Sequence, residues 1–322
     1  MVLLAGCQST PRRSRAEEIR RAQPLLGTFV VISAYGTNVA TTQRAIDDAF
    51  EAVRRVDALM SLHRADSELS RANAQAARQP VPVSKELFRV MTAAQDIAHE
   101  TSGAFDVTIR PVAELWGFIW KQHRLPSPFE LEPALANVGY RSLLLDPTQR
   151  TVQFARPGVS IDLGGIAKGY AVDRAIESLR AHGITNCMVR AGGDLRASGA
   201  PPGEKAWEVQ LEDPERQGRR IHVKLRDAAI STAGNYENFF EVNGRRYSHI
   251  LNPLTGMPVE GIAACAVRAT TCMESDGWST ALFVLGPEQA MARFGASLAF
   301  RFTLSPAASQ PGIWPVVESS RW

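Results

Sequence analysis

The segment IDLGGIAKGYAVD, residues 161–173, places charged side chains and adjacent glycines inside an otherwise apolar run. Its pattern predicts a strand over 159–163 that turns at Gly164-Gly165 into a helix starting at Ile166. Glycines let a ligand approach the main chain, and a helix start offers unpaired N–H donors to an anion. Lys168 opposes the helix dipole unless a phosphate or carboxylate lies above it. The alternative is a plain turn followed by a solvated lysine.

The chain around this segment contains both helical and strand patterns, and each half of the chain contains both. Residues 26–36 predict a strand, 41–60 an amphipathic helix, and a further helix follows Ser84 and ends before Gly103. Asn243-Gly244 lies between apolar strands and predicts a hairpin. The second half of the chain predicts short strands over 151–162, 186–191, 206–211, 221–230 and 238–251. It also predicts two helices, one over 166–182 and one from Ser275 or Asp276 to Leu285.

These elements predict an α+β fold with mixed or antiparallel sheets and flanking helices. We expect one compact domain, in one or two lobes, over residues 24–322, preceded by a short N-terminal segment over 1–23. The 322 residues carry 45% hydrophobic and 21% charged side chains with a formal net charge of +3. The charge is too weak and too diffuse for a nucleic-acid groove, so no nucleic-acid partner is expected. No apolar run reaches the ~20 residues of a membrane-spanning helix.

Three of the four cysteines lie in strand-like apolar segments and show no CxxC spacing, so they indicate buried thiols rather than a zinc site. Cys7 is different, because Leu4-Ala5-Gly6-Cys7 resembles a lipobox, in which the cysteine is lipidated. The apolar stretch before it is short and lacks basic residues, so either translation starts upstream or the match is accidental. A polar segment over 8–23 favours a truncated lipoprotein signal followed by a tether.

The segment ESDGWSTALFVLG, residues 274–286, places Asp276 and Thr280 four residues apart at a predicted helix start. Their oxygens then share one helix face and could hold a hard cation such as Mg²⁺. An N-cap Asp with an incidental Thr is the alternative, and for the segment taken alone it is the stronger one.

Three further stretches carry weaker signals. His249 in SHILNPLTGMP stands beside a turn and is either a general base or a polar strand residue. Phe105 and Asp106 in TSGAFDVT could hold a flat ring, or they are a core aromatic and a turn residue. The Gly-Gly-Asp at 192–194 is equally well a hairpin turn.

Together these motifs resemble a family. GAFDVT, DLGGIAKGYAVD, AGGD, AISTAGNYE, YSHILNPLTG and DGWSTAL follow in the order and spacing of the bacterial FAD:protein FMN transferases, the ApbE family. LGTFVVISAYG (26–36) and LMSLHRADSELSRAN (59–73) resemble its N-terminal elements, so the resemblance covers residues 24–290. It implies a periplasmic, membrane-tethered enzyme, lipid-anchored through Cys7, that cleaves FAD and attaches FMN to a Ser or Thr of a target protein.

The resemblance also implies site residues. Carried over residue by residue, the FAD contacts fall on Leu26, His63, Ala104, Phe105, Asp106, Asp162, Lys168 and Ile250. The Mg²⁺ site falls on the carbonyl of Gly165 and the side chains of Asp276 and Thr280. His63 departs from the family, which often has an aromatic residue there; if that residue stacks on adenine, His63 stacks more weakly.

The implied reaction is attack of a protein hydroxyl on the pyrophosphate of FAD, with AMP leaving. Mg²⁺ and Lys168 would neutralise charge, and His249 is the candidate base. The expected partner is an acceptor protein with a Ser/Thr site, a membrane redox subunit. Two alternatives stay open at this level: a pyrophosphatase that yields FMN and AMP, and a non-catalytic lipoprotein that binds flavin.

Overall fold

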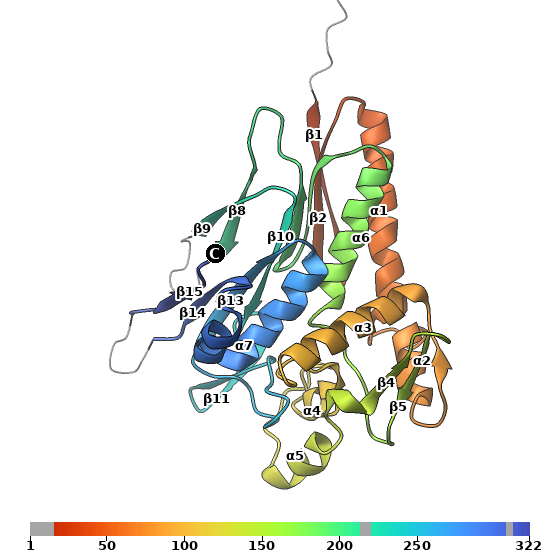
Figure 1. Cartoon of the computed structure of the whole chain (residues 1–322), viewed down its shortest axis with the longest axis vertical. Helices are drawn as coiled ribbons and strands as arrows, with labels where there is room; N and C mark the ends of the chain where they lie inside the picture. The colour runs from red at the N-terminus through yellow and green to blue at the C-terminus, as the bar shows by residue number, and fades with distance from the viewer. Residues whose placement is uncertain (1–15, 213–219, 307–311) are drawn as a thin grey trace, which may run out of the picture.

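The computed structural model describes residues 16–212, 220–306 and 312–322, and its centre is one large sheet (Figure 1). All neighbouring strands of this sheet pair antiparallel, in the order β1-β2-β6-β7-β10-β13-β14-β15. The strands of the sheet are β1 Glu17–Leu25, β2 Thr28–Gly36, β6 Asn186–Ala191, β7 Asp194–Ser198, β10 Ala228–Gly234, β13 Ile262–Ala269, β14 Ala299–Leu304 and β15 Val316–Glu318.

Smaller sheets accompany the large one. The order β3-β5-β4 forms a three-stranded sheet, and β8-β9 and β11-β12 are two-stranded. Their strands are β3 Val81–Pro82, β4 Leu143–Asp146, β5 Thr151–Phe154, β8 Trp207–Glu212, β9 Arg220–Leu225, β11 Phe239–Val242 and β12 Arg245–Ser248. Antiparallel sheets with flanking helices are the α+β class that the sequence predicts.

The helices α1 Val39–Met60, α6 Ala167–Ala181 and α7 Cys272–Phe294 pack against the large sheet, and the three shortest helices gather with β4 and β5 at one end of the molecule (Figure 1). The main apolar core lies between the long helices and the sheet. The helices are α1 Val39–Met60, α2 Glu68–Gln75, α3 Lys85–Glu100, α4 Arg110–Leu115, α5 Pro128–Leu135, α6 Ala167–Ala181 and α7 Cys272–Phe294, with short 3-10 turns at Val107–Ile109 and Tyr140–Ser142.

Local signals explain where most helices begin. The Asn38 side chain accepts a hydrogen bond from the backbone of Thr41, and Ser84 accepts one from Leu87, so both cap helix starts. For α7 the predicted start at Ser275 or Asp276 was wrong, whereas the predicted end at Leu285 lies directly before a kink at Gly286, whose φ of 80° is not helical. The helix begins at Cys272 because Thr271 and Glu274 form a reciprocal capping box, which places Asp276 inside the helix rather than at its cap.

The helices α6 and α7 cross very closely at Gly169. A Cβ built on Gly169 would lie 2.2 Å from the carbonyl oxygen of Cys272 and 2.8 Å from the Cβ of Asp276. Asp173, one turn further along α6, accepts hydrogen bonds from the N–H groups of Cys272 and Met273 at 2.8 and 2.9 Å. The segment 161–173 therefore both permits the crossing and caps the helix that it crosses.

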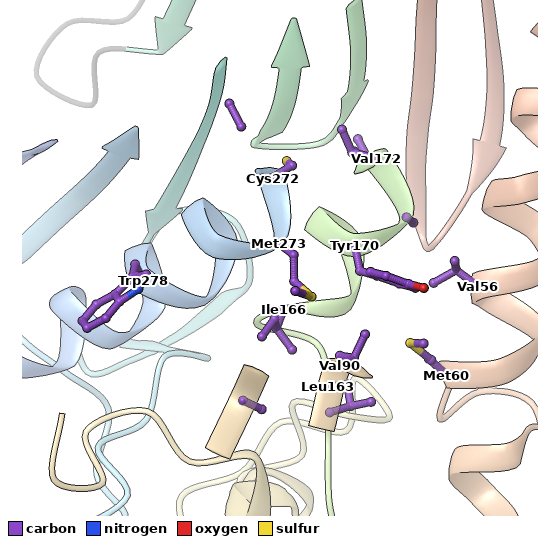
Figure 2. Packing of buried hydrophobic residues seen from close by; sticks show 14 of the residues in the cluster. Val56, Met60, Val90, Leu163, Ile166, Tyr170, Val172, Cys272, Met273 and Trp278 are labelled. Atoms are coloured by element: carbon purple, nitrogen blue, oxygen red, sulfur yellow. The ribbon is translucent and has the colours of Figure 1, made fainter. Parts of the chain in front are cut away.

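Apolar side chains fill the space around this crossing (Figure 2). Tyr170 is directed from α6 toward Val56 of α1, and Ile166 and Met273 lie in the seam between α6 and α7. All four belong to the main core, so the position of α6 is fixed from both sides by buried apolar area.

Several predicted boundaries differ in the structure. Residues 159–163 do not form a strand, because Asn73 and the carbonyl of Val107 take the hydrogen bonds of Ile161 and Asp162. Residues 17–23, expected to be a tether, belong to β1, an edge strand. Its Arg21 and Gln23 side chains are half-buried and bind Asp47 and Arg54 of α1 at 2.6 Å each. The stretch 151–162 is a strand only up to Phe154, and 221–230 divides between β9 and β10.

Other predictions are confirmed. The hairpin at Asn243-Gly244 joins β11 to β12, with φ values of 52° and 75° that fit a two-residue turn. Cys187, Cys265 and Cys272 are buried free thiols. Within the described residues, none of the helices is both long and apolar enough to span a membrane. Cys7 lies outside the described residues.

Candidate active site

A deep cleft opens beside the N-terminal end of α6 and consists of two adjoining hollows of about 1050 and 560 Å³. The larger is bordered by the β1–β2 turn and the end of α1, and the smaller reaches α7 and the segment after β12. Side chains and turns that line both hollows come from five separate parts of the chain, namely Leu26, Gly27, Thr28, His63, Ala113, Asp162, Gly164, Lys168, Asn238 and His249.

Lys168 lies between two buried carboxylates. Its Nζ donates to Asp194 Oδ2 at 2.6 Å and lies 3.8 Å from Asp276 Oδ1. The Asp194 and Asp276 side chains are 4% and 5% exposed, whereas the Lys168 side chain is 36% exposed toward the cleft. The second oxygen of Asp276 accepts a hydrogen bond from the Gly169 N–H at 2.9 Å. Neither sequence alternative for Lys168 foresaw this cluster.

Burial and mutual repulsion set the charge state of the cluster. Burial raises the pKa of Asp276 to about 7, and the nearby Asp194 raises it while Lys168 opposes the change. Burial alone would lower the pKa of Lys168, but the two carboxylates raise it above its ordinary value, so the amine stays charged. Once Asp276 is ionised, two carboxylates against one ammonium leave one negative charge without compensation, and an additional cation would be favourable there.

The three residues expected to bind Mg²⁺ come together on one wall of the smaller hollow. Asp276 and Thr280 share a face of α7, and a Cβ built on Gly165 would lie 3.2 Å from Thr280 Oγ1 and 3.3 Å from the Phe105 ring. Only a glycine fits this cradle without displacing a neighbour. No group of three or more His, Cys, Asp or Glu that could hold a metal occurs among the described residues. The donor set is instead one carboxylate, one hydroxyl and one carbonyl, which suits Mg²⁺ because Mg²⁺ retains several waters.

His249 lies in the wall of the same cleft, just after β12. Its Nδ1 is 3.0 Å from the Asn238 carbonyl oxygen, which can only accept, so Nδ1 carries the proton and donates. Burial, together with the charge of Lys168, lowers the pKa of His249 to about 4, although the hydrogen bond to Asn238 raises it. At neutral pH the imidazole is therefore uncharged, with an unprotonated Nε2.

Two predicted FAD contacts also hold local turns. Asp162 Oδ1 accepts a hydrogen bond from the Gly164 N–H at 2.8 Å, which fixes the glycine turn before α6. Asp106 Oδ1 accepts from both the N–H and the hydroxyl of Thr108, at 2.8 and 2.6 Å. Burial raises the pKa of both carboxyls. Their contact with FAD stays a prediction, and each is a turn residue as well as a cleft residue.

The other predicted FAD residues border the cleft. Ala104, Phe105 and Ile250 are buried in the wall of the smaller hollow. Leu26 stands in the two-residue β1–β2 turn with a φ of 56°, and it lines both hollows together with exposed His63. The structure therefore brings every predicted site residue to one cleft.

Trp120 lies edge-on to His63, with ring centroids 5.4 Å apart, but it lines neither hollow. Sequence reasoning missed the role of Asp194, which lines the smaller hollow. Asp194 follows a Gly-Gly turn between β6 and β7, which hid its role because the turn alone explained the motif. The signal that could have found Asp194 is its place in an apolar strand segment, because a buried carboxylate needs a cation partner.

Comparisons with known proteins place the chain among relatives of one family. The model of the ApbE family matches residues 26–299. An FAD:protein FMN transferase of Haemophilus influenzae is 36% identical over 265 residues, 80% of this chain and 77% of its own. One from Vibrio cholerae is 35% identical, over 91% of this chain and 87% of its own.

Solved structures are similar over almost the whole chain. The flavin transferase ApbE from Vibrio cholerae has a TM-score of 0.83 at 31% identity and covers 95% of this chain and 98% of its own. The ApbE protein of Thermotoga maritima has a TM-score of 0.84 at 30% identity, with 94% and 97% covered. Fold, cleft and relatives together define an enzyme of the transferase class. The chain belongs to the ApbE family.

Proposed function

We propose that this protein transfers FMN from FAD to a Ser or Thr hydroxyl of a target protein and releases AMP, in a reaction that depends on Mg²⁺. The observation that carries the proposal is that Lys168, Asp276 and Thr280 share one cleft with the neutral imidazole of His249. The relatives named as FAD:protein FMN transferases support the flavin substrate and the protein acceptor.

In this reaction the acceptor oxygen attacks the phosphorus on the FMN side of the pyrophosphate. A new P–O bond forms, the bond to the AMP oxygen breaks, and AMP leaves. The hydroxyl proton passes to Nε2 of His249, which is free because Nδ1 is held by the Asn238 carbonyl. Lys168 lies at the cleft side of its cluster and can approach the pyrophosphate oxygens.

The residues present fit a Mg²⁺ ion. Asp276, Thr280 and the carbonyl of Gly165 would hold it, and the uncompensated negative charge of the carboxylate cluster would attract it. When bound, the ion would neutralise the charge of the pyrophosphate and of the departing AMP. The orientation of the Asp276 carboxylate is fixed, because its Oδ2 accepts a hydrogen bond from the Gly169 N–H. Its Oδ1 lies 3.8 Å from Lys168 Nζ and is the oxygen that would bind the ion.

The test is an incubation of the protein with FAD, Mg²⁺ and a peptide bearing a candidate acceptor Ser or Thr. We expect equal amounts of released AMP and of peptide with the added mass of FMN, both lost in Asp276→Ala while FAD binding, followed by flavin fluorescence, weakens less. AMP and free FMN without modified peptide would indicate a pyrophosphatase. FAD binding without any AMP would indicate a flavin-binding protein.

A matched pair of variants separates the metal role from general damage to α7. Thr280→Val removes the hydroxyl at nearly constant volume and is expected to raise the Mg²⁺ concentration needed for half-maximal rate at least tenfold. Ser279→Ala removes a neighbouring hydroxyl that donates only to the Asp276 carbonyl oxygen, at 2.9 Å. We expect Ser279→Ala to keep the wild-type Mg²⁺ dependence; equal effects of the two variants would contradict the Thr280 assignment.

We propose that the protein acts in the bacterial periplasm, anchored to a membrane by a lipid on Cys7, and that its acceptor is a membrane redox subunit. The lipobox-like Leu4-Ala5-Gly6-Cys7 and the polar residues 8–15 after it support the anchor. Cys7→Ser, expressed from the native gene, should move the protein from the membrane to the soluble fraction with its activity intact. Soluble fractionation of the unmodified protein would refute the anchor.

A further inference from the structure

Asp194 is a buried carboxylate that the proposed reaction does not use. It is the first residue of β7, directly after the Gly192-Gly193 turn, and its side chain is 4% exposed. Burying a carboxylate is unfavourable unless a cation pairs with it. In the part of the chain that the structure describes, Lys168 is the one cation paired with Asp194, at 2.6 Å.

Lys168 lies closer to Asp194 than to Asp276. The 2.6 Å contact to Asp194 is a hydrogen-bonded ion pair, while the 3.8 Å separation from Asp276 Oδ1 is too long for a hydrogen bond. A lysine side chain is flexible, so about 1 Å of movement would let it bind Asp276 instead. The ammonium would then occupy the oxygen that the proposed cation needs.

We propose that Asp194 is a positioning residue that holds the ammonium of Lys168 away from Asp276 and so keeps the Asp276 Oδ1 available to a divalent cation. This inference rests on the proposed function, because it assumes that Asp276 is a metal ligand. Asp194 contacts neither Thr280 nor the Gly165 cradle in the hydrogen bonds of the structure and acts through Lys168.

The arrangement predicts how the affinity for a divalent cation changes when one or both charges of the pair Lys168–Asp194 are removed. In Asp194→Asn, Lys168 loses its stronger partner and turns to Asp276, so affinity for a divalent cation should fall at least tenfold. Removing the lysine charge as well, in the double variant Lys168→Met/Asp194→Asn, leaves Asp276 with its Gly169 hydrogen bond and no competing ammonium. The double variant should bind the cation within about threefold of the wild-type affinity.

The experiment measures binding of Mn²⁺ directly, from the electron paramagnetic resonance signal of the free ion, without FAD and without turnover. The four proteins are the wild type, Asp194→Asn, Lys168→Met/Asp194→Asn, and Asp276→Asn as the variant without the ligand. In parallel, FMN transfer is measured against Mg²⁺ concentration. A positioning role predicts that excess Mg²⁺ restores kcat in Asp194→Asn, which a general folding defect would not allow.

Each result has a distinct meaning. Unchanged Mn²⁺ affinity in Asp194→Asn overturns the inference and leaves the proposed function standing. A double variant as weak as the single variant also overturns it, because Asp194 would then contact the cation itself. A wild type that does not bind Mn²⁺, or that binds it no better than Asp276→Asn, refutes the metal assignment and this inference with it. If Asp194→Asn does not fold, the double variant alone decides, since wild-type affinity supports the inference and a tenfold loss overturns it.

Discussion

Gly169→Ala tests the helix crossing on which the site depends. The added methyl group would lie 2.2 Å from the Cys272 carbonyl oxygen and 2.6 Å from its carbonyl carbon, both backbone atoms that cannot rotate away. Ordinary contacts begin near 3.4 Å, so α6 and α7 must separate by about 1 Å. Overpacking of this kind costs about 1–3 kcal/mol, and the better helix propensity of Ala returns at most about 1 kcal/mol.

We therefore expect Gly169→Ala to lower the free energy of unfolding by about 1–2 kcal/mol, measured by urea unfolding. The rate of FMN transfer should fall even under conditions in which the variant is fully folded. Separation of the helices moves Lys168 on α6 away from Asp276 on α7 and weakens the Gly169 hydrogen bond to that carboxylate. A displacement of about 1 Å in a catalytic group costs roughly 100-fold in rate.

Gly277→Ala is the matched control, because Gly277 is also a helical glycine near the same seam. Its added methyl group would lie 2.5 Å from the Ile97 Cδ1 atom, the far end of a flexible side chain that can turn aside. We expect a stability change within about 1 kcal/mol and an activity close to wild type. If Gly169→Ala were as stable and as active as Gly277→Ala, the close crossing would not be what positions the site.

Lys168→Met should weaken FAD binding roughly ten- to a hundredfold, measured by flavin fluorescence. Because it also leaves buried Asp194 without its cation, we expect about 1–3 kcal/mol less stability in thermal unfolding, whereas a solvated lysine would change neither quantity. Transfer should decline as the pH falls below about 7, because protonation removes the Asp276 carboxylate, and excess Mg²⁺ should move the midpoint lower; a midpoint independent of Mg²⁺ would contradict this. The free energy of unfolding should change with pH in the opposite direction. Asp276 holds its proton up to about pH 7 in the folded state and loses it near pH 4 in the unfolded state, so its contribution to stability falls as the pH rises from 4 to 7. His249→Gln should lower kcat about 10²- to 10⁴-fold with little change in the KM for FAD, and a near-normal kcat would exclude His249 as the base.

The amino-acid sequence alone determined the local features of this protein. Asn38 and Ser84 cap their helices, and Asn243-Gly244 makes its hairpin, because these signals act between residues a few positions apart. The α+β class followed from the helical and strand patterns, and the family followed from the resemblance of the motifs. The start of α7 was predicted at Ser275 or Asp276, although the capping box of Thr271 and Glu274, which places it at Cys272, is also a local signal.

The tertiary structure alone decided what the charged residues do. Lys168 pairs with Asp194 and approaches Asp276 because the close crossing at Gly169 brings α6 and α7 together beside the start of β7. The sequence separations of these residues carry no information about that distance, and the charge state of each depends on burial that only packing creates. From the sequence, Lys168 was either a ligand of a phosphate or a solvated surface residue. In the folded chain it lies between the buried carboxylates of Asp194 and Asp276.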